Sequence, residues 1–85
     1  QSGMWVDYQV QVTSAEPLQL TYATIASSQV CVYVDEVAQA IVDVPKTSDM
    51  NTWNTLNTNV VCAKGRHTVR VEMLKGVINL QKIKN

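Results

Sequence analysis

Short runs in which apolar and polar residues alternate one by one follow each other along almost the whole chain. In residues 5–12, WVDYQVQV, every second residue from Val6 onward is apolar. A period of two places neighbouring side chains on opposite faces of a β-strand, so each run predicts a strand with one buried and one solvated face. No stretch of useful length has the 3.6-residue period of an amphipathic helix. This alternation restricts the chain to an all-β fold.

Further runs of this kind occupy residues 18–25, 29–35, 40–44, 52–62, 67–73 and 77–83, which makes seven predicted strands. They are separated by turn residues, including Asp35-Glu36 and Lys64-Gly65, and by a loop over residues 46–51 after Pro45. This loop is rich in short polar side chains, which are expected to hydrogen-bond their own backbone. We expect the strand over 52–62 to be bent or bulged at its polar middle. Short strands with frequent turns predict an antiparallel β-sandwich.

Length and charge limit the classes of function. A chain of 85 residues is one domain, predicted over residues 4–85, and the Gln-Ser-Gly before Met4 is interpreted as an expression-vector remnant. Seven Lys and Arg against seven Asp and Glu provide no basic field for nucleic acid or for an anionic membrane. No apolar run approaches the roughly 20 residues of a membrane span, and no signal peptide is present in these residues.

Residues that could carry catalysis or bind a metal are few. Cys31, Cys62 and His67 are too few and too widely spaced for a zinc site. The two cysteines form either a disulfide or two buried free thiols, of which the thiols are favoured. His67 follows a turn and is expected to hydrogen-bond it rather than to act as a base. No nucleophile, phosphate or dinucleotide motif occurs, so the sequence predicts no enzyme and no catalytic residue.

The order of several segments resembles that of the family 6 carbohydrate-binding modules. The matching segments are GMWVDYQVQV, LQLTYA, VCVYVDE, VDVPKTSDMNTWNT, VVCAKGRHTVRV and GVINLQKI. The resemblance spans nearly all of residues 4–83 and implies a jelly-roll-like sandwich that binds a polysaccharide or oligosaccharide, β-linked in this expectation, without catalysis. Members of that family are usually secreted, and the compartment of this chain stays open.

The resemblance also implies two sugar-binding residues. Trp53 matches a tryptophan whose ring stacks on a sugar, and Asn79 matches an asparagine that hydrogen-bonds sugar hydroxyls. The chemistry is sensible, because an indole covers the C–H face of a pyranose while an amide both donates and accepts. Trp5 matches a tryptophan that mainly packs, and is interpreted as structural.

The departures from the family pattern imply further expectations. Met50 and Lys82 stand where the family has tryptophans, and the family's opening strands, with most acidic ligands of its calcium, have no match in this sequence. We therefore expect no calcium or other cofactor. A sandwich without its opening strands exposes a strand edge, which favours a homo-oligomer. The alternative function is a structural or protein-interaction domain that self-associates through this edge without binding sugar.

Overall fold

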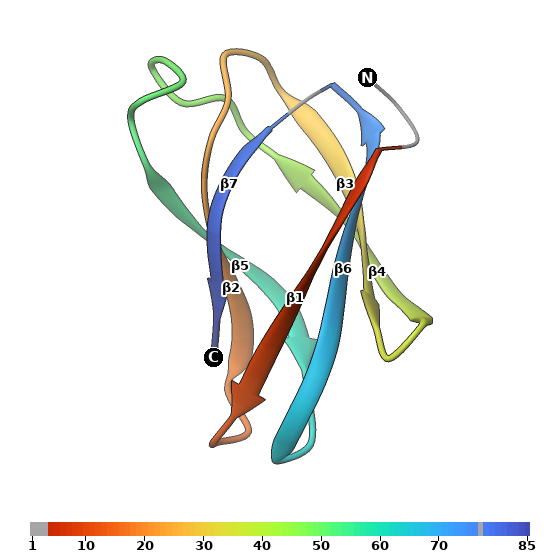
Figure 1. Ribbon diagram of the computed structural model, residues 1–85. Coiled ribbons are helices and arrows are strands. Elements are labelled where there is room, and N and C mark those ends of the chain that lie inside the picture. Colours follow the sequence, from red (N-terminus) through yellow and green to blue (C-terminus); the bar gives the residue numbers. More distant parts are fainter. Residues whose placement is uncertain (1–3, 77) are drawn as a thin grey trace.

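The structure is a computed structural model that describes residues 4–76 and 78–85. Residues 1–3, interpreted above as a vector remnant, and Val77, in the last predicted strand, lie outside the described residues. The described chain forms seven strands (Figure 1). They are β1 (Trp5–Val12), β2 (Pro17–Ala23), β3 (Ser28–Val34), β4 (Val37–Val44), β5 (Asn54–Val61), β6 (Gly65–Lys75) and β7 (Asn79–Lys84).

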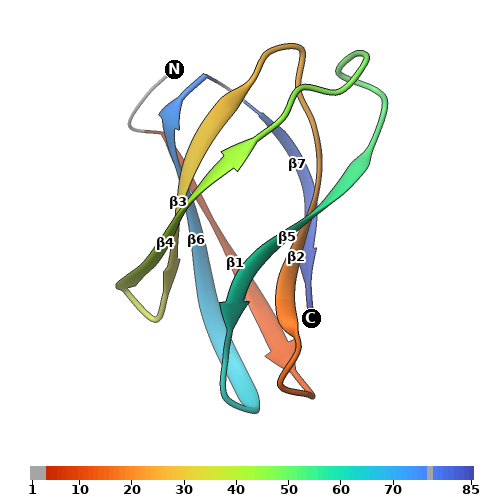
Figure 2. The ribbon, with the colours of Figure 1, turned by 180° about the vertical axis from the view of Figure 1, so that it is seen from behind.

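The strands form two antiparallel sheets that face each other, and the prediction of an all-β antiparallel sandwich is confirmed. The four-stranded sheet has the order β1-β6-β3-β4, and the three-stranded sheet has the order β5-β2-β7. Figures 1 and 2 show the two layers from opposite sides. Neighbours in a sheet are mostly distant in the sequence, as in the pairing of Tyr8 on β1 with Val69 on β6.

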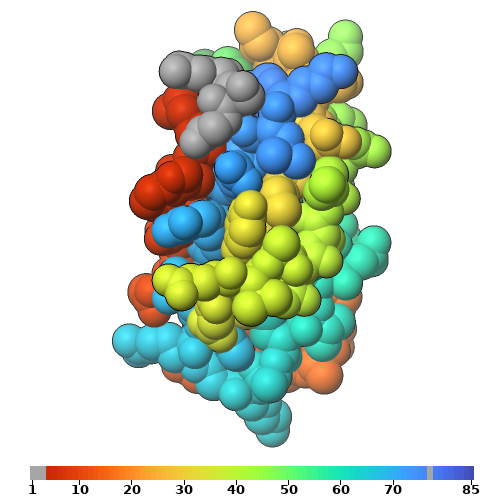
Figure 3. Space-filling view, turned by 90° about the vertical axis from the view of Figure 1, so that its right-hand side faces the viewer, coloured from red at the N-terminus to blue at the C-terminus, as the bar shows by residue number. Residues whose placement is uncertain are grey.

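The apolar positions of the alternating runs form the core between the sheets. Leu18, Leu20 and Tyr22 of β2 are buried and face the valines of the four-stranded sheet, as their alternation predicts. Burial of each such side chain stabilises the fold by about 1.5–3 kcal/mol. The alternating polar residues of β1 remain exposed on the outer face. Figure 3 looks onto that outer face, where β1, β6, β3 and β4 lie side by side.

The strand bounds differ from the prediction where turns decide them. β4 begins at Val37 rather than at residue 40, because Asp35 and Glu36 make a two-residue hairpin with φ of 50° and 72°. Positive φ at both positions is the geometry of a type I′ turn, whose twist suits a hairpin. β5 is irregular at its polar middle, as predicted: Asn59 has φ of 63° and the register with β2 shifts between Pro17 and Gln19.

Three of the loops that connect the sheets gather at one end of the sandwich. The segments 24–27 and 45–53 lie at the top in Figure 1, together with Gly76 and Ile78 between β6 and β7. Each joins a strand of one sheet to a strand of the other. This end therefore collects loop residues from three separate parts of the chain.

Candidate sugar-binding site

The loop over residues 45–53, here called the β4–β5 loop, is tied to the end of β2. The hydroxyl of Tyr22 donates to the carbonyl of Pro45 at 2.8 Å. The backbone N–H of Thr47 donates to the carbonyl of Thr24 at 2.7 Å, and the N–H of Thr24 donates back to the hydroxyl of Thr47 at 3.1 Å. Thr47 is buried, so these bonds are shielded from water. The first half of the loop is therefore firmly held.

Asp49 organises the second half of the same loop. Its carboxylate accepts hydrogen bonds from the N–H of Asn51 at 2.8 Å and from the hydroxyl of Thr52 at 3.0 Å. These bonds favour the charged form, and they lower the pKa of Asp49 below its ordinary value. Short polar side chains that bond their own backbone were predicted for this loop, and they are present. The turn leads directly into Trp53.

Trp53 and Asn79 flank the end of β2 from opposite sides. Asn54, next to Trp53, pairs with Tyr22, whereas Asn79 pairs with Ala23. Adjacent strands lie 4.7–4.9 Å apart, so the backbones of β5 and β7 are separated by about 10 Å at this level. The two residues thus lie at the same end of the same sheet.

The two side chains are available to a ligand to different degrees. The indole of Trp53 has an exposed fraction of 40% and is not part of the core. The amide of Asn79 is exposed and donates to the carbonyl of Met50 at 3.4 Å. An amide has two N–H groups and one acceptor oxygen, so among the described residues Asn79 retains an N–H and a carbonyl for hydroxyl groups. The exposed indole can cover the face of a sugar ring, and the amide on the other side of β2 can hydrogen-bond the hydroxyls at the edge of that ring.

Trp5 is not a core residue, which corrects its structural interpretation. Its exposed fraction is 55%, and the Arg70 guanidinium stacks 3.9 Å from its ring centroid. Arg70 also donates to both carboxylate oxygens of Asp7, at 2.8 and 3.1 Å, which lowers the pKa of Asp7. The alternation could have revealed this, because Trp5 lies on the same face of β1 as exposed Asp7 and not on the face of half-buried Val6.

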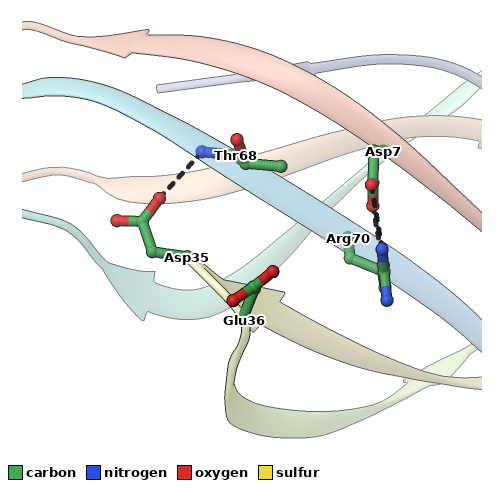
Figure 4. A pocket seen from close by; sticks show the side chains of 5 residues that line it. All are labelled: Asp7, Asp35, Glu36, Thr68 and Arg70. Atoms are coloured by element: carbon green, nitrogen blue, oxygen red, sulfur yellow. Dashed lines mark hydrogen bonds and ion pairs between the residues drawn. The ribbon is translucent and has the colours of Figure 1, made fainter.

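A second set of polar groups lies beside this stack. Figure 4 shows Asp7 and Arg70 facing each other, with Asp35 and Glu36 of the hairpin beside Thr68. They line a pocket of about 280 Å³. Asp35 accepts from the N–H of Thr68 at 3.0 Å and bonds Nδ1 of His67 at 2.7 Å. The described carboxylates here are largely occupied by protein partners.

His67 has the structural role that the sequence predicts. Nδ1 faces Asp35 and Nε2 lies 2.7 Å from the carbonyl of Ala63. Both partners are acceptors, so the doubly protonated ring suits the site, and the hydrogen bond to Asp35 raises the pKa of His67. The imidazole therefore joins the β3–β4 hairpin to the turn before β6.

The cysteines are free thiols. Cys31 lies on β3 and Cys62 directly after β5, and both are buried. Of the two alternatives left open by the sequence, the structure has the pair of thiols. Burial raises the pKa of Cys62, so its reactive thiolate is disfavoured.

Residues 4–76 and 78–85 contain no group of three or more His, Cys, Asp or Glu side chains that could hold a metal ion. The same residues contain no helix long and apolar enough to cross a membrane.

The sequence model described as Carbohydrate binding module (family 35) matches residues 1–85. The chain belongs to this family. The predicted family, family 6, was therefore wrong, whereas the prediction of a carbohydrate-binding module was right. Alternating strands separated by turns are common to sandwich folds, so the order of such segments did not separate one family from another.

Solved structures agree with this assignment at the level of the fold. A family 35 module from an environmental isolate has a TM-score of 0.76 and 18% identity, covering 96% of this chain and 64% of that one. A family 35 module from Clostridium thermocellum has a TM-score of 0.76 and 19% identity, covering 96% and 68%. This chain thus spans about two thirds of the length of these modules. No curated protein sequence matches it.

The fold also occurs as a small part of enzymes. The cycloalternan-forming enzyme from Listeria monocytogenes, solved in complex with a pentasaccharide substrate, has a TM-score of 0.74 and 22% identity. The match covers 93% of this chain but only 8% of the enzyme. The family model matches the whole of this chain as a carbohydrate-binding module, a class that is typically non-catalytic.

Proposed function

We propose that this family 35 module holds a β-linked polysaccharide by stacking a sugar ring on Trp53 and hydrogen-bonding its hydroxyls with Asn79. The observation that carries the proposal is the hydrogen bond from Asn79 to Met50, because it ties β7 to the loop that presents Trp53. No catalytic step is part of the proposal.

The chemistry of the pair supports this role. An indole presents a flat apolar face to the C–H groups of a pyranose, and a stacked ring is worth about 0.5–1.5 kcal/mol beyond its buried area. Each hydrogen bond adds about 0.5–1.5 kcal/mol net. Because the loop is held by Thr24, Thr47 and Asp49, little ordering entropy is lost on binding. A few such contacts give the weak, reversible affinity that suits a binding module.

The test is affinity electrophoresis and calorimetry with a panel of β-linked polysaccharides. Trp53→Ala should strongly reduce retardation by the best ligand, whereas Trp53→Tyr should retain more of it because a ring remains. Trp5→Ala is the matched control on the outer face of the other sheet. Equal retardation of wild type and Trp53→Ala would remove Trp53 from the site.

A second candidate function is self-association through an open flank of the sandwich. β1 and β7 are both edge strands, and a hollow of about 220 Å³ between them is lined mainly by apolar side chains. Met4 and Trp5 there have exposed fractions of 50% and 55%. An edge with unpaired backbone groups beside apolar surface is a template for a second chain.

Light scattering measures this directly. A mass of two chains for the wild type, and of one chain for Trp5→Lys, would support the homo-oligomer. A well-folded wild-type monomer at the highest soluble concentration would contradict it. Sugar binding that persists in the monomeric variant would separate this function from the proposed site.

A further inference from the structure

The other open flank, between the edge strands β4 and β5, carries a groove that neither Trp53 nor Asn79 lines. Its volume of about 540 Å³ exceeds those of the two pockets described above. Sites for small molecules usually measure about 300–1,000 Å³, so this groove is large enough for a sugar unit. We call it the β4–β5 groove.

The floor of the β4–β5 groove is aliphatic. Val44 is buried, Pro45 begins the β4–β5 loop, and Leu56 of β5 is half-buried. Pro45 is held in place because its carbonyl accepts the hydroxyl of Tyr22. A surface of C–H groups favours the apolar face of a ring and disfavours a fully charged ligand.

The rim of the groove is a row of three polar side chains on adjacent strands. Gln29 on β3 has Asp43 of β4 as its partner on one side and Lys75 of β6 on the other. The amide of Gln29 donates to the carboxylate of Asp43 at 3.2 Å. Two strand spacings make this row about 10 Å long. The register of the sheet thereby aligns the three residues that carry an ammonium, an amide and a carboxylate.

The chemistry of the row indicates its ligand. The ammonium supplies only donors, the carboxylate supplies only acceptors, and the amide supplies both. The charges of Asp43 and Lys75 cancel, so the rim has no net charge that would select an ion. Adjacent hydroxyls, each of which donates and accepts, match such a set of groups. A neutral pyranose unit combines these hydroxyls with an apolar face.

The groove also lies within reach of the proposed stacking site. Trp53 stands directly before β5, and Leu56 is three residues further along the chain. At about 3.3 Å per residue, their backbones are roughly 10 Å apart. A short oligosaccharide can therefore extend from one to the other.

We infer that the β4–β5 groove is a second carbohydrate site, in which Gln29, Asp43 and Lys75 bind the hydroxyls of a neutral pyranose over the aliphatic floor. The inference rests on the proposed function for its class of ligand, a carbohydrate. The residues of the groove are argued independently of Trp53 and Asn79. Two linked contacts raise the overall affinity, because the second binds at the effective concentration set by the first.

The experiment is an amide chemical-shift titration of the isotopically labelled protein with cellohexaose, xylohexaose and laminarihexaose. At least one ligand should shift the amides of Gln29, Asp43 and Lys75. Gln29→Ala and Lys75→Ala should each weaken binding about fivefold to tenfold, as expected for loss of one hydrogen bond. Lys64→Ala, an exposed lysine in the turn before β6, should leave the affinity unchanged.

The Trp53→Ala variant separates this inference from the proposed function. Groove shifts that persist in Trp53→Ala, and that need about fivefold to tenfold more ligand in Gln29→Ala, support an independent second site. Shifts around Trp53 and Asn79 with none in the groove overturn the second site and leave the proposed function intact. Absence of shifts at both places overturns both.

Discussion

The side-chain amide of Asn79 donates a hydrogen bond to the backbone carbonyl of Met50, with 3.4 Å between the heavy atoms. Asn79 begins β7, whereas Met50 lies in the loop before β5. Since β2 separates these strands, the amide reaches across the end of a strand to the neighbouring loop. The proposed site is thus assembled from segments about 30 residues apart in the sequence.

Asn79→Ala should weaken sugar binding about tenfold. The variant removes the hydrogen bonds proposed to reach the hydroxyls, at about 0.5–1.5 kcal/mol each, and releases the loop from β7. Calorimetry with the best polysaccharide measures the change, and circular dichroism confirms that the sheets persist. Gln81→Ala, also exposed on β7, is the control. Equal losses in the two variants would point to a general effect on β7.

Asp49→Ala should weaken binding several-fold although Asp49 is not proposed to touch the sugar. Its carboxylate organises the turn before Trp53, so its loss should increase motion of the loop. Amide relaxation over residues 48–53 measures this motion. Lys46→Ala is the matched exposed change in the same loop. An unaltered affinity in Asp49→Ala would show that the turn does not position Trp53.

The same aspartate gives a pH dependence with a definite sign. Hydrogen bonds from Asn51 and Thr52 lower the folded pKa of Asp49 below its ordinary value of 3.8. The stabilisation they provide is therefore present above pH 3.8 and is lost as the pH falls through the lowered value.

The contact between His67 and Asp35 should make stability fall as the pH rises above neutrality. The hydrogen bond to Asp35 raises the folded pKa of His67 above its ordinary value of 6.5. Its stabilisation is complete below pH 6.5 and is lost as the pH rises through the raised value. The hydrogen bond with His67 lowers the folded pKa of Asp35 below its ordinary value of 3.8. The stabilisation contributed by its carboxylate is therefore lost only as the pH falls through that lowered value.

Melting temperatures across pH 5 to 9, for the wild type and for His67→Gln, test this coupling. The difference between the two proteins should be largest below pH 6.5 and should shrink at higher pH. A difference that stays constant over this range would mean that the charge of His67 contributes nothing. Asp35→Asn should reduce the dependence in the same way, because it removes the negative partner.

Chelation should leave sugar binding unchanged. The described residues contain no group of three or more His, Cys, Asp or Glu side chains that could hold a metal ion, and the proposed pair consists of an indole and an amide. Titration of the polysaccharide in the presence of EDTA, followed by readdition of calcium, measures any dependence. A loss of affinity in EDTA that calcium restores would contradict the expectation of a module without a cofactor.

Local alternation was enough to predict the strands and most of the core. Leu18, Leu20 and Tyr22 are buried as expected, and His67 bonds the turn as expected. The errors have local causes as well. β4 begins early because a hairpin with positive φ needs only two residues. Trp5 was interpreted as structural from the family resemblance, although its place in the alternation of β1 puts it on the exposed face.

The β4–β5 groove could not have been predicted from the sequence. Gln29 and Asp43 belong to two different runs and Lys75 lies after a third, and no spacing along the chain relates them. Their alignment follows from the strand order β6-β3-β4 and from its register, in which irregularities occur beside Gln29 and after Val32. A shift of one residue would turn each side chain to the opposite face.

The sequence by itself determined which segments are strands and which face of each is buried, because a period of two acts between neighbours along the chain. The tertiary structure alone decided that Trp53 and Asn79 lie at one end and that the polar row forms beside Leu56. Strand order and register depend on contacts between residues distant in the sequence, such as the pairing of Tyr8 with Val69. Those contacts become specific only when both sheets close on one core.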